Sequence, residues 1–326
     1  MKNLPKAELH LHLDGAISPN LIKELGQKNH IHVSKDIFTP DGKAFTWSDF
    51  SSFHRVFVES FKVIRSKEDY HLITYTHLKT LAEQNTLYTE LIVSPEMGQV
   101  NGMTYSEILE GLTSGIDSAR QDFGIEARIL MVFMRHYGPQ AALETANQII
   151  NEHHPYVVGV NLVGDIKQYE VKAFAPAFEK VRAAGLEGSC HAGELEGGPE
   201  EIWQAIDYLG AKRISHGVRC VEDTKLVDEL IKRNIVLEVC PTSNIALKMY
   251  PNYEIHPLAQ LHDAGLKLTL NTDDPAFFNT TLSEEYEIAK QYGHFTEQAL
   301  LNSTKIAIEA GFMDNQLKTS LLNKII

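Results

Sequence analysis

The sequence has few cysteines and no long apolar run. Its 326 residues include only three cysteines, Cys190, Cys220 and Cys240. Such a sparse, odd set does not predict a disulfide framework, so we expect the three thiols to be core residues. No apolar run reaches the roughly 18 residues of a membrane span, and the N-terminus lacks the apolar segment of a secretory signal. These absences predict a cytoplasmic protein that does not bind membranes.

Positive charge is also scarce, with 30 Lys and Arg against 43 Asp and Glu and a formal net charge of -13. This balance argues against a nucleic-acid partner and is compatible with a small neutral substrate. With 43% hydrophobic residues the chain can build a large core. No linker, low-complexity stretch or repeat interrupts it, so we expect one domain over residues 1–326, while the oligomeric state is not specified.

Short apolar runs alternate with longer helical patterns along most of the chain. Eight runs read as strands buried on both faces: Ala7–His12, Leu87–Val93, Ala127–Phe133, Val157–Val163, Leu186–His191, Arg213–His216, Ile235–Cys240 and Leu266–Thr272. Gly124, Gly185 and Gly265 follow three of the helical patterns, as helix C-termini favour. The pattern predicts the α/β class and a (β/α)8 TIM-type barrel. An open doubly wound sheet is the alternative, although no Gly-rich dinucleotide-binding turn follows a strand.

An aromatic segment interrupts the alternation after the first strand. Residues Ile31–Phe61 include Phe45, Trp47, Phe50, Phe53, Phe57 and Phe61, and from Phe50 the aromatics recur at helical spacing. The stripe fits either core packing or an apolar lid over the barrel mouth. The tail after Pro275 is helical by pattern.

Polar residues gather where four of the predicted strands end, which is where a barrel of this kind places its active site. His10 and His12 point to the same side of the first strand. Each of these features also has a structural explanation when it is taken singly. A pair of histidines can occur on a surface strand by chance, and a single histidine can be a core residue. Asp273-Asp274 can cap the helix that follows. Their joint position, with Cys190-His191-Ala192-Gly193-Glu194 and Ser215-His216-Gly217 at two further strand ends, favours a metal site instead.

The motifs HLHLDG, CHAGE, SHGVR and LNTDDPAFF, in this order, resemble the signature set of the adenosine deaminase family among the metal-dependent amidohydrolase barrels. The resemblance extends from about Leu4 to about Leu282. It implies one zinc ion per chain. The implied ligands are His10, His12, His191 and Asp273, a sensible donor set for a catalytic zinc.

The resemblance also implies catalytic and substrate-binding roles. Glu194 would protonate purine N1, His216 would accept a proton from the attacking water, and Asp273 would take part in catalysis as well as in metal binding. The substrate contacts would come from His12, Asp14, Gly164 and Asp274. Asp274 is expected to bind N7, the backbone of Gly164 to bind N3, and Asp14 to accept a ribose hydroxyl.

These roles predict hydrolysis of adenosine or 2′-deoxyadenosine to inosine or 2′-deoxyinosine and ammonia, with a purine nucleoside as the partner. The end of the fourth strand, Gly164-Asp165, favours a nucleoside, because adenine-specific relatives tend to carry a Ser-rich segment there. The aromatic segment favours it as well, since it could enclose a ligand bulkier than a bare base. Asn161 and Ile166 depart from the family pattern, which usually has Asp and Glu at these positions.

Three alternatives remain. A sibling deaminase of adenine or of a modified adenosine, such as aminodeoxyfutalosine, would use the same site. A binuclear amidohydrolase would need a Lys at the end of the fourth strand, and Lys167 lies beyond it. A non-catalytic binding protein would be expected to have lost ligands or Glu194.

Overall fold

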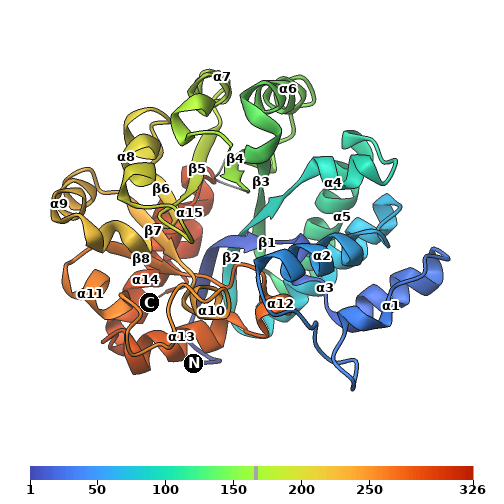
Figure 1. Ribbon diagram of the computed structural model, residues 1–326, viewed down its shortest axis with the longest axis horizontal. Helices are drawn as coiled ribbons and strands as arrows, with labels where there is room; N and C mark the ends of the chain where they lie inside the picture. The colour runs from blue at the N-terminus through green and yellow to red at the C-terminus, as the bar shows by residue number, and fades with distance from the viewer. Residues whose placement is uncertain (165–167, 326) are drawn as a thin grey trace.

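Eight parallel strands form a nearly closed barrel with helices packed around it (Figure 1). This computed structural model describes residues 1–164 and 168–325, except for the side chain of residue 50. The strands are β1 (Lys6–His12), β2 (Thr86–Val93), β3 (Glu126–Met134), β4 (Val157–Val163), β5 (Glu187–Ala192), β6 (Arg213–His216), β7 (Val236–Val239) and β8 (Lys267–Leu270). They pair in chain order from β1 to β8. The predicted (β/α)8 barrel is confirmed.

The barrel closes through backbone hydrogen bonds just beyond β8. The amide of Asp273 donates to the carbonyl of His10 over 3.2 Å, and the amide of His12 donates to the carbonyl of Asp273 over 2.9 Å. Two segments far apart in the sequence therefore meet at their polar ends.

Helices alternate with the strands, as the sequence pattern predicts. They are α1 (Pro19–Lys28), α2 (Phe50–Phe61), α3 (Lys67–Ala82), α4 (Pro95–Val100), α5 (Tyr105–Phe123), α6 (Gly138–Asn151), α7 (Ala175–Ala183), α8 (Pro199–Asp207), α9 (Thr224–Lys232), α10 (Pro241–Ala246), α11 (Leu258–Asp263), α12 (Pro275–Phe278), α13 (Leu282–Tyr292), α14 (Glu297–Ala310) and α15 (Asn315–Leu322). Helix α5 shows how the sequence sets such boundaries. Thr104 and Glu107 form a capping box at its start, and Gly124 ends it in the left-handed conformation at φ 74°.

The apolar strands separate two packing surfaces. Leu91 and Ile129 belong to the large cluster that the strands share with the surrounding helices, whereas their neighbours Ile92 and Leu130 join Val132 in a separate small cluster. This alternation is the two-residue period of a strand, and it leaves both faces buried. No helix in the described ranges is long and apolar enough to cross a membrane. All three cysteines are free and buried, as predicted.

Candidate functional site

Five side chains predicted from separate motifs converge at the carboxyl end of the barrel. They are His10 and His12 of β1, His191 of β5, His216 of β6 and Asp273 after β8. The Oδ1 atom of Asp273 lies 3.2 Å from His10 Nε2 and 3.4 Å from His12 Nε2. His12 Nε2 also lies 3.3 Å from His191 Nε2. The ring nitrogens and the carboxylate therefore face one common point.

The arrangement fits a metal ion. One ligand atom from each of His10, His191, His216 and Asp273 lies within 4.8 Å of the others. Within the part of the chain that the structure describes, the buried Nε2 atoms of His10 and His216 have no hydrogen-bond partner. Imidazole nitrogens with one carboxylate form a donor set that suits zinc. An ion would satisfy His10 Nε2, and the water that it binds could satisfy His216 Nε2. His12 lies beside this tight group, so the predicted ligand set with His12 stays a prediction.

Three of the four imidazoles around this point are held in the neutral form. Burial opposes a charge on the fourth, His10, but the neighbouring Asp273 raises the pKa of His10. Burial lowers the pKa of His12 to about 4 and that of His216 to about 3, and the neighbouring His10 acts in the same direction on His216. Burial likewise lowers the pKa of His191. A neutral imidazole can ligate a metal or accept a proton, whereas a protonated one can do neither.

Asp273 is the anion of the cluster. Burial opposes its charge, but the charge of His10 holds the pKa of Asp273 well below its usual range. Its Oδ2 atom accepts a hydrogen bond of 2.6 Å from the hydroxyl of Ser243 on α10. The carboxylate is thus oriented from one side and free to face the histidines on the other.

The backbone is strained at two of these positions. His216 has φ 63° and Asp273 has φ 65°, a left-handed conformation that few non-glycine residues adopt. Each residue lies at or just after the end of a strand. The left-handed turn directs its side chain into the barrel mouth. Strain of this kind gathers at functional sites.

Glu194 lies on the loop after β5, beside His216. Its Oε1 atom is 3.5 Å from His216 Nε2. Burial, followed by the charge of Asp273, raises the pKa of Glu194 to about 8. The raised pKa favours the protonated carboxyl group, which is the form that the predicted role at purine N1 requires.

The predicted substrate contacts line a cavity of about 150 Å³ beside the histidines. Asp14, Gly164 and Asp274 all border it. Burial raises the pKa of Asp274 well above its ordinary value, and the charge of Asp273 adds to this effect. Burial also raises the pKa of Asp14 to about 8, although a backbone hydrogen bond from Ser94 opposes the shift. The cavity is small beside the roughly 300–1,000 Å³ of most ligand clefts.

The aromatic segment lies partly in the core and partly along the cavity. Phe53 and Phe57 of α2 line the cavity, whereas Phe45 and Phe61 are buried in the core. The Phe53 ring stacks on Phe278 with centroids 5.7 Å apart. The segment therefore forms one wall of the cavity; that it moves as a lid stays a prediction.

Sequence reasoning missed a chain of side chains behind His216. Asn244 of α10 lies with Nδ2 3.3 Å from His216 Nδ1, and its Oδ1 lies 3.0 Å from His256 Nε2. Ser243 and Asn244 follow the end of β7, so the rule that found the other site residues could have found these two. Nothing in the sequence pairs His256 with them.

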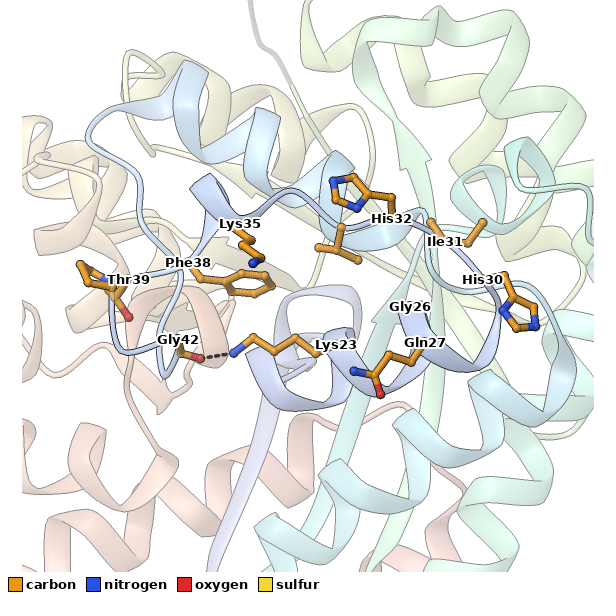
Figure 2. Close-up of a pocket in the computed structure, with 12 residues that line it drawn as sticks. Lys23, Gly26, Gln27, His30, Ile31, His32, Lys35, Phe38, Thr39 and Gly42 are labelled. Carbon is orange, nitrogen blue, oxygen red and sulfur yellow. Dashed lines mark hydrogen bonds between the residues drawn. The ribbon is translucent and has the colours of Figure 1, made fainter.

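A larger cavity, about 890 Å³, lies elsewhere, between α1 and the loop that follows it (Figure 2). Lys23 donates a hydrogen bond of 2.5 Å to the carbonyl of Gly42 across it. Its lining in the described part of the chain includes no carboxylate, cysteine or residue of the histidine cluster. Size alone therefore does not mark the reactive site. Asp165, Ile166 and Lys167, which the sequence singled out at the end of β4, lie outside the described residues.

Comparisons with known proteins agree with this site. The family model described as Adenosine deaminase matches residues 5–326. An adenine deaminase of Sinorhizobium medicae (strain WSM419) is 43% identical over 320 residues, which is 98% of each chain. The crystal structure of adenine deaminase from Arthrobacter aurescens superposes with a TM-score of 0.90 at 27% identity, covering 99% of this chain and 98% of that one. An amidohydrolase from Burkhoderia ambifaria with bound Zn has a TM-score of 0.88 at 25% identity, covering 98% and 88%.

These relatives correct the predicted substrate. The nucleoside prediction depended on Asp14 and on Gly164-Asp165, but the full-length relatives are named adenine deaminase. In the structure, Asp14 is only 7% exposed in a cavity that Phe53, Phe57 and Phe278 also line, so a sugar hydroxyl would have little access to its carboxyl group. The role of Asp14 as the acceptor of a ribose hydroxyl depended on the nucleoside prediction and is not proposed again.

The cluster of histidines and Asp273, which could hold a metal ion, the matched family model and the full-length relatives agree on one kind of chemistry. The chain belongs to the adenosine deaminase family of the amidohydrolase superfamily and is a deaminase.

Proposed function

We propose that this protein is a zinc-dependent adenine deaminase that converts adenine and water to hypoxanthine and ammonia. The observation that carries the substrate is the small cavity beside the histidines, since about 150 Å³ suits a bare base. The names of the full-length relatives support the same substrate. We further propose that His10, His12, His191 and Asp273 hold one zinc ion, and the zinc-bound relative supports the metal.

A bound zinc ion would supply Lewis-acid activation of the attacking water. His216 is neutral at working pH and buried beside Glu194, so it can accept the proton that the water loses. As the oxygen adds to C6 of adenine, Glu194 gives its proton to N1. The hydroxyl proton of the adduct then passes to the amino group, which leaves as ammonia, and C6 becomes the carbonyl carbon of hypoxanthine. The proton that His216 took from the water returns to Glu194.

Glu194 would hold the ring for this attack. In its protonated form it donates a hydrogen bond to N1, which draws electron density from C6. Asp274, also favoured in its protonated form, would donate to N7, and the backbone amide of Gly164 would donate to N3. Hydrogen bonds from three donors to three ring nitrogens would fix the orientation of the purine in the cavity. They would thereby select a 6-aminopurine as the substrate.

The test is a reaction in ¹⁸O-labelled water with zinc-loaded protein and adenine. We expect equal amounts of ammonia and hypoxanthine, with one ¹⁸O atom in the hypoxanthine carbonyl. If adenine released no ammonia but a nucleotide or a 6-substituted adenine did, the deaminase activity would stand. Adenine would then be rejected as the substrate. Ammonia from none of these compounds would reject the proposed function.

A further inference from the structure

A line of buried polar side chains runs through the barrel beneath the histidine cluster. Arg213 and Ser215 belong to β6, Glu238 to β7 and Asn161 to β4, and each is at most 1% exposed. The line ends at the ring of His191 on β5. These four strands are consecutive neighbours in the sheet, so side chains that point inward from them meet.

The hydrogen bonds along this line have a fixed direction. Glu238 forms an ion pair with Arg213, whose Nε lies 2.8 Å from Oε1. An ionised carboxylate can only accept, so the hydroxyl of Ser215 must donate its one proton to Glu238 Oε2, 2.7 Å away. The lone pairs of Ser215 Oγ are then left to accept a hydrogen bond.

That direction orients the amide of Asn161. Its Nδ2 donates one hydrogen to Ser215 Oγ over 3.0 Å and the other to Ser189 Oγ over 2.6 Å. Its Oδ1 therefore faces His191 and lies 2.8 Å from Nδ1. Because Oδ1 can only accept, His191 Nδ1 must carry the hydrogen.

We propose that this chain of hydrogen bonds, from Glu238 through Ser215 and Asn161, fixes the tautomer and the ring orientation of His191. It leaves the lone pair of His191 Nε2 directed at the cluster, where His12 Nε2 is 3.3 Å away. Asn161 and Ser215 are then positioning residues, because neither one faces the cavity. The proposal rests on the metal site of the proposed function, whose ligand His191 it orients.

The same direction gives a reason for an amide at position 161. An aspartate there could not donate to Ser215, and it would compete with Glu238 for the single hydroxyl proton of Ser215. One of the two buried carboxylates would then lose its donor, which is costly in a site without water. Asn161 and Glu238 thus belong to one consistent network.

The test combines ring ¹⁵N spectra with zinc release. In the zinc-free full-length protein, with His191 assigned from a His191→Asn variant, we expect a single His191 form protonated at Nδ1. In zinc-loaded protein with excess chelator, Ser215→Ala should release zinc about 10–100-fold faster than the wild type, the usual effect of removing a partner behind a ligand. Ser215→Thr, which restores a hydroxyl, should return release close to the wild-type rate.

Ser303→Ala is the matched control. Ser303 is 1% exposed and donates to a backbone carbonyl of β8, so its loss also removes a buried hydroxyl but lies outside the network. Wild-type His191 protonated at Nε2 would overturn the proposal, even if Ser215→Ala failed to fold. Equal zinc release from Ser215→Ala and Ser303→Ala would overturn it as well. A protein that releases no ammonia from adenine would contradict the proposed function but would leave the ¹⁵N result readable.

Discussion

Gly15 lies so close to Asp274 that a Cβ atom at position 15 would be 1.8 Å from Oδ1 of Asp274. Glycine at this position therefore determines where the carboxyl group sits in the cavity. The turn after β1 therefore packs directly against the turn after β8. This contact lies next to the backbone hydrogen bonds that close the barrel.

Gly15→Ala should displace the Asp274 side chain and weaken binding of the purine. Loss of one buried hydrogen bond costs roughly 1–3 kcal/mol, so kcat/KM for adenine should fall at least about tenfold. Zinc content should stay at the wild-type value. Gly198→Ala is the control, because nothing lies within 4 Å of a Cβ atom there. Unchanged kinetics in Gly15→Ala would argue against a role for Asp274 in binding.

Glu194→Gln should keep its fold and its zinc but lose turnover. Gln cannot deliver a proton to N1, and general acid–base groups contribute about 10²–10⁴-fold. Steady-state kcat and metal content are the measurements. Glu196→Gln, an exposed carboxylate on the same loop, serves as the control and should retain turnover. A fully active Glu194→Gln enzyme would remove Glu194 from the mechanism.

His12→Ala should lose both zinc and activity. Elemental analysis of protein purified without added metal should find about one zinc per chain in the wild type and much less in this variant. His294→Ala, whose side chain is exposed, should match the wild type. A His12→Ala protein that retains its full zinc complement would mean that His10, His191, His216 and Asp273 hold the ion without it.

Phe57→Ala should open the cavity wall. Adenine KM should rise by roughly three- to tenfold, since a half-buried phenyl contributes a fraction of the 1.5–3 kcal/mol of full burial. The preference for adenine over adenosine should narrow at the same time. Phe123→Ala removes a half-buried ring far from the mouth and should change neither quantity. Equal effects of the two variants would indicate a general loss of stability instead.

The sequence predicted the barrel because both of its signals are local. Strands such as β3 contain long apolar runs, and helices such as α5 carry their own caps. The polar residues could be placed as well, because each follows a strand and all the strands point the same way. His10, His191 and Asp273 therefore converge as expected.

The features of the site that the sequence did not predict depend on contacts between strands. Nothing near Asn161 in the sequence says that its amide faces His191, and its difference from the family pattern could be noted but not explained. The sequence did contain one signal for buried ion pairs between strands, namely the charged residues Glu90, Arg213 and Glu238. A charge inside an otherwise apolar strand needs a buried partner. The substrate was missed because residues at one strand end do not determine the volume that α2 and α12 leave.

The most direct test of the proposed function compares kcat/KM for adenine and adenosine on the same zinc-loaded protein, measured as ammonia release. Forcing extra atoms into a packed space typically costs about 1–3 kcal/mol, and a ribose must enter a cavity of about 150 Å³. Adenine should therefore react at least about tenfold more efficiently than adenosine. Equal or higher efficiency with adenosine would contradict the assignment of adenine as the substrate.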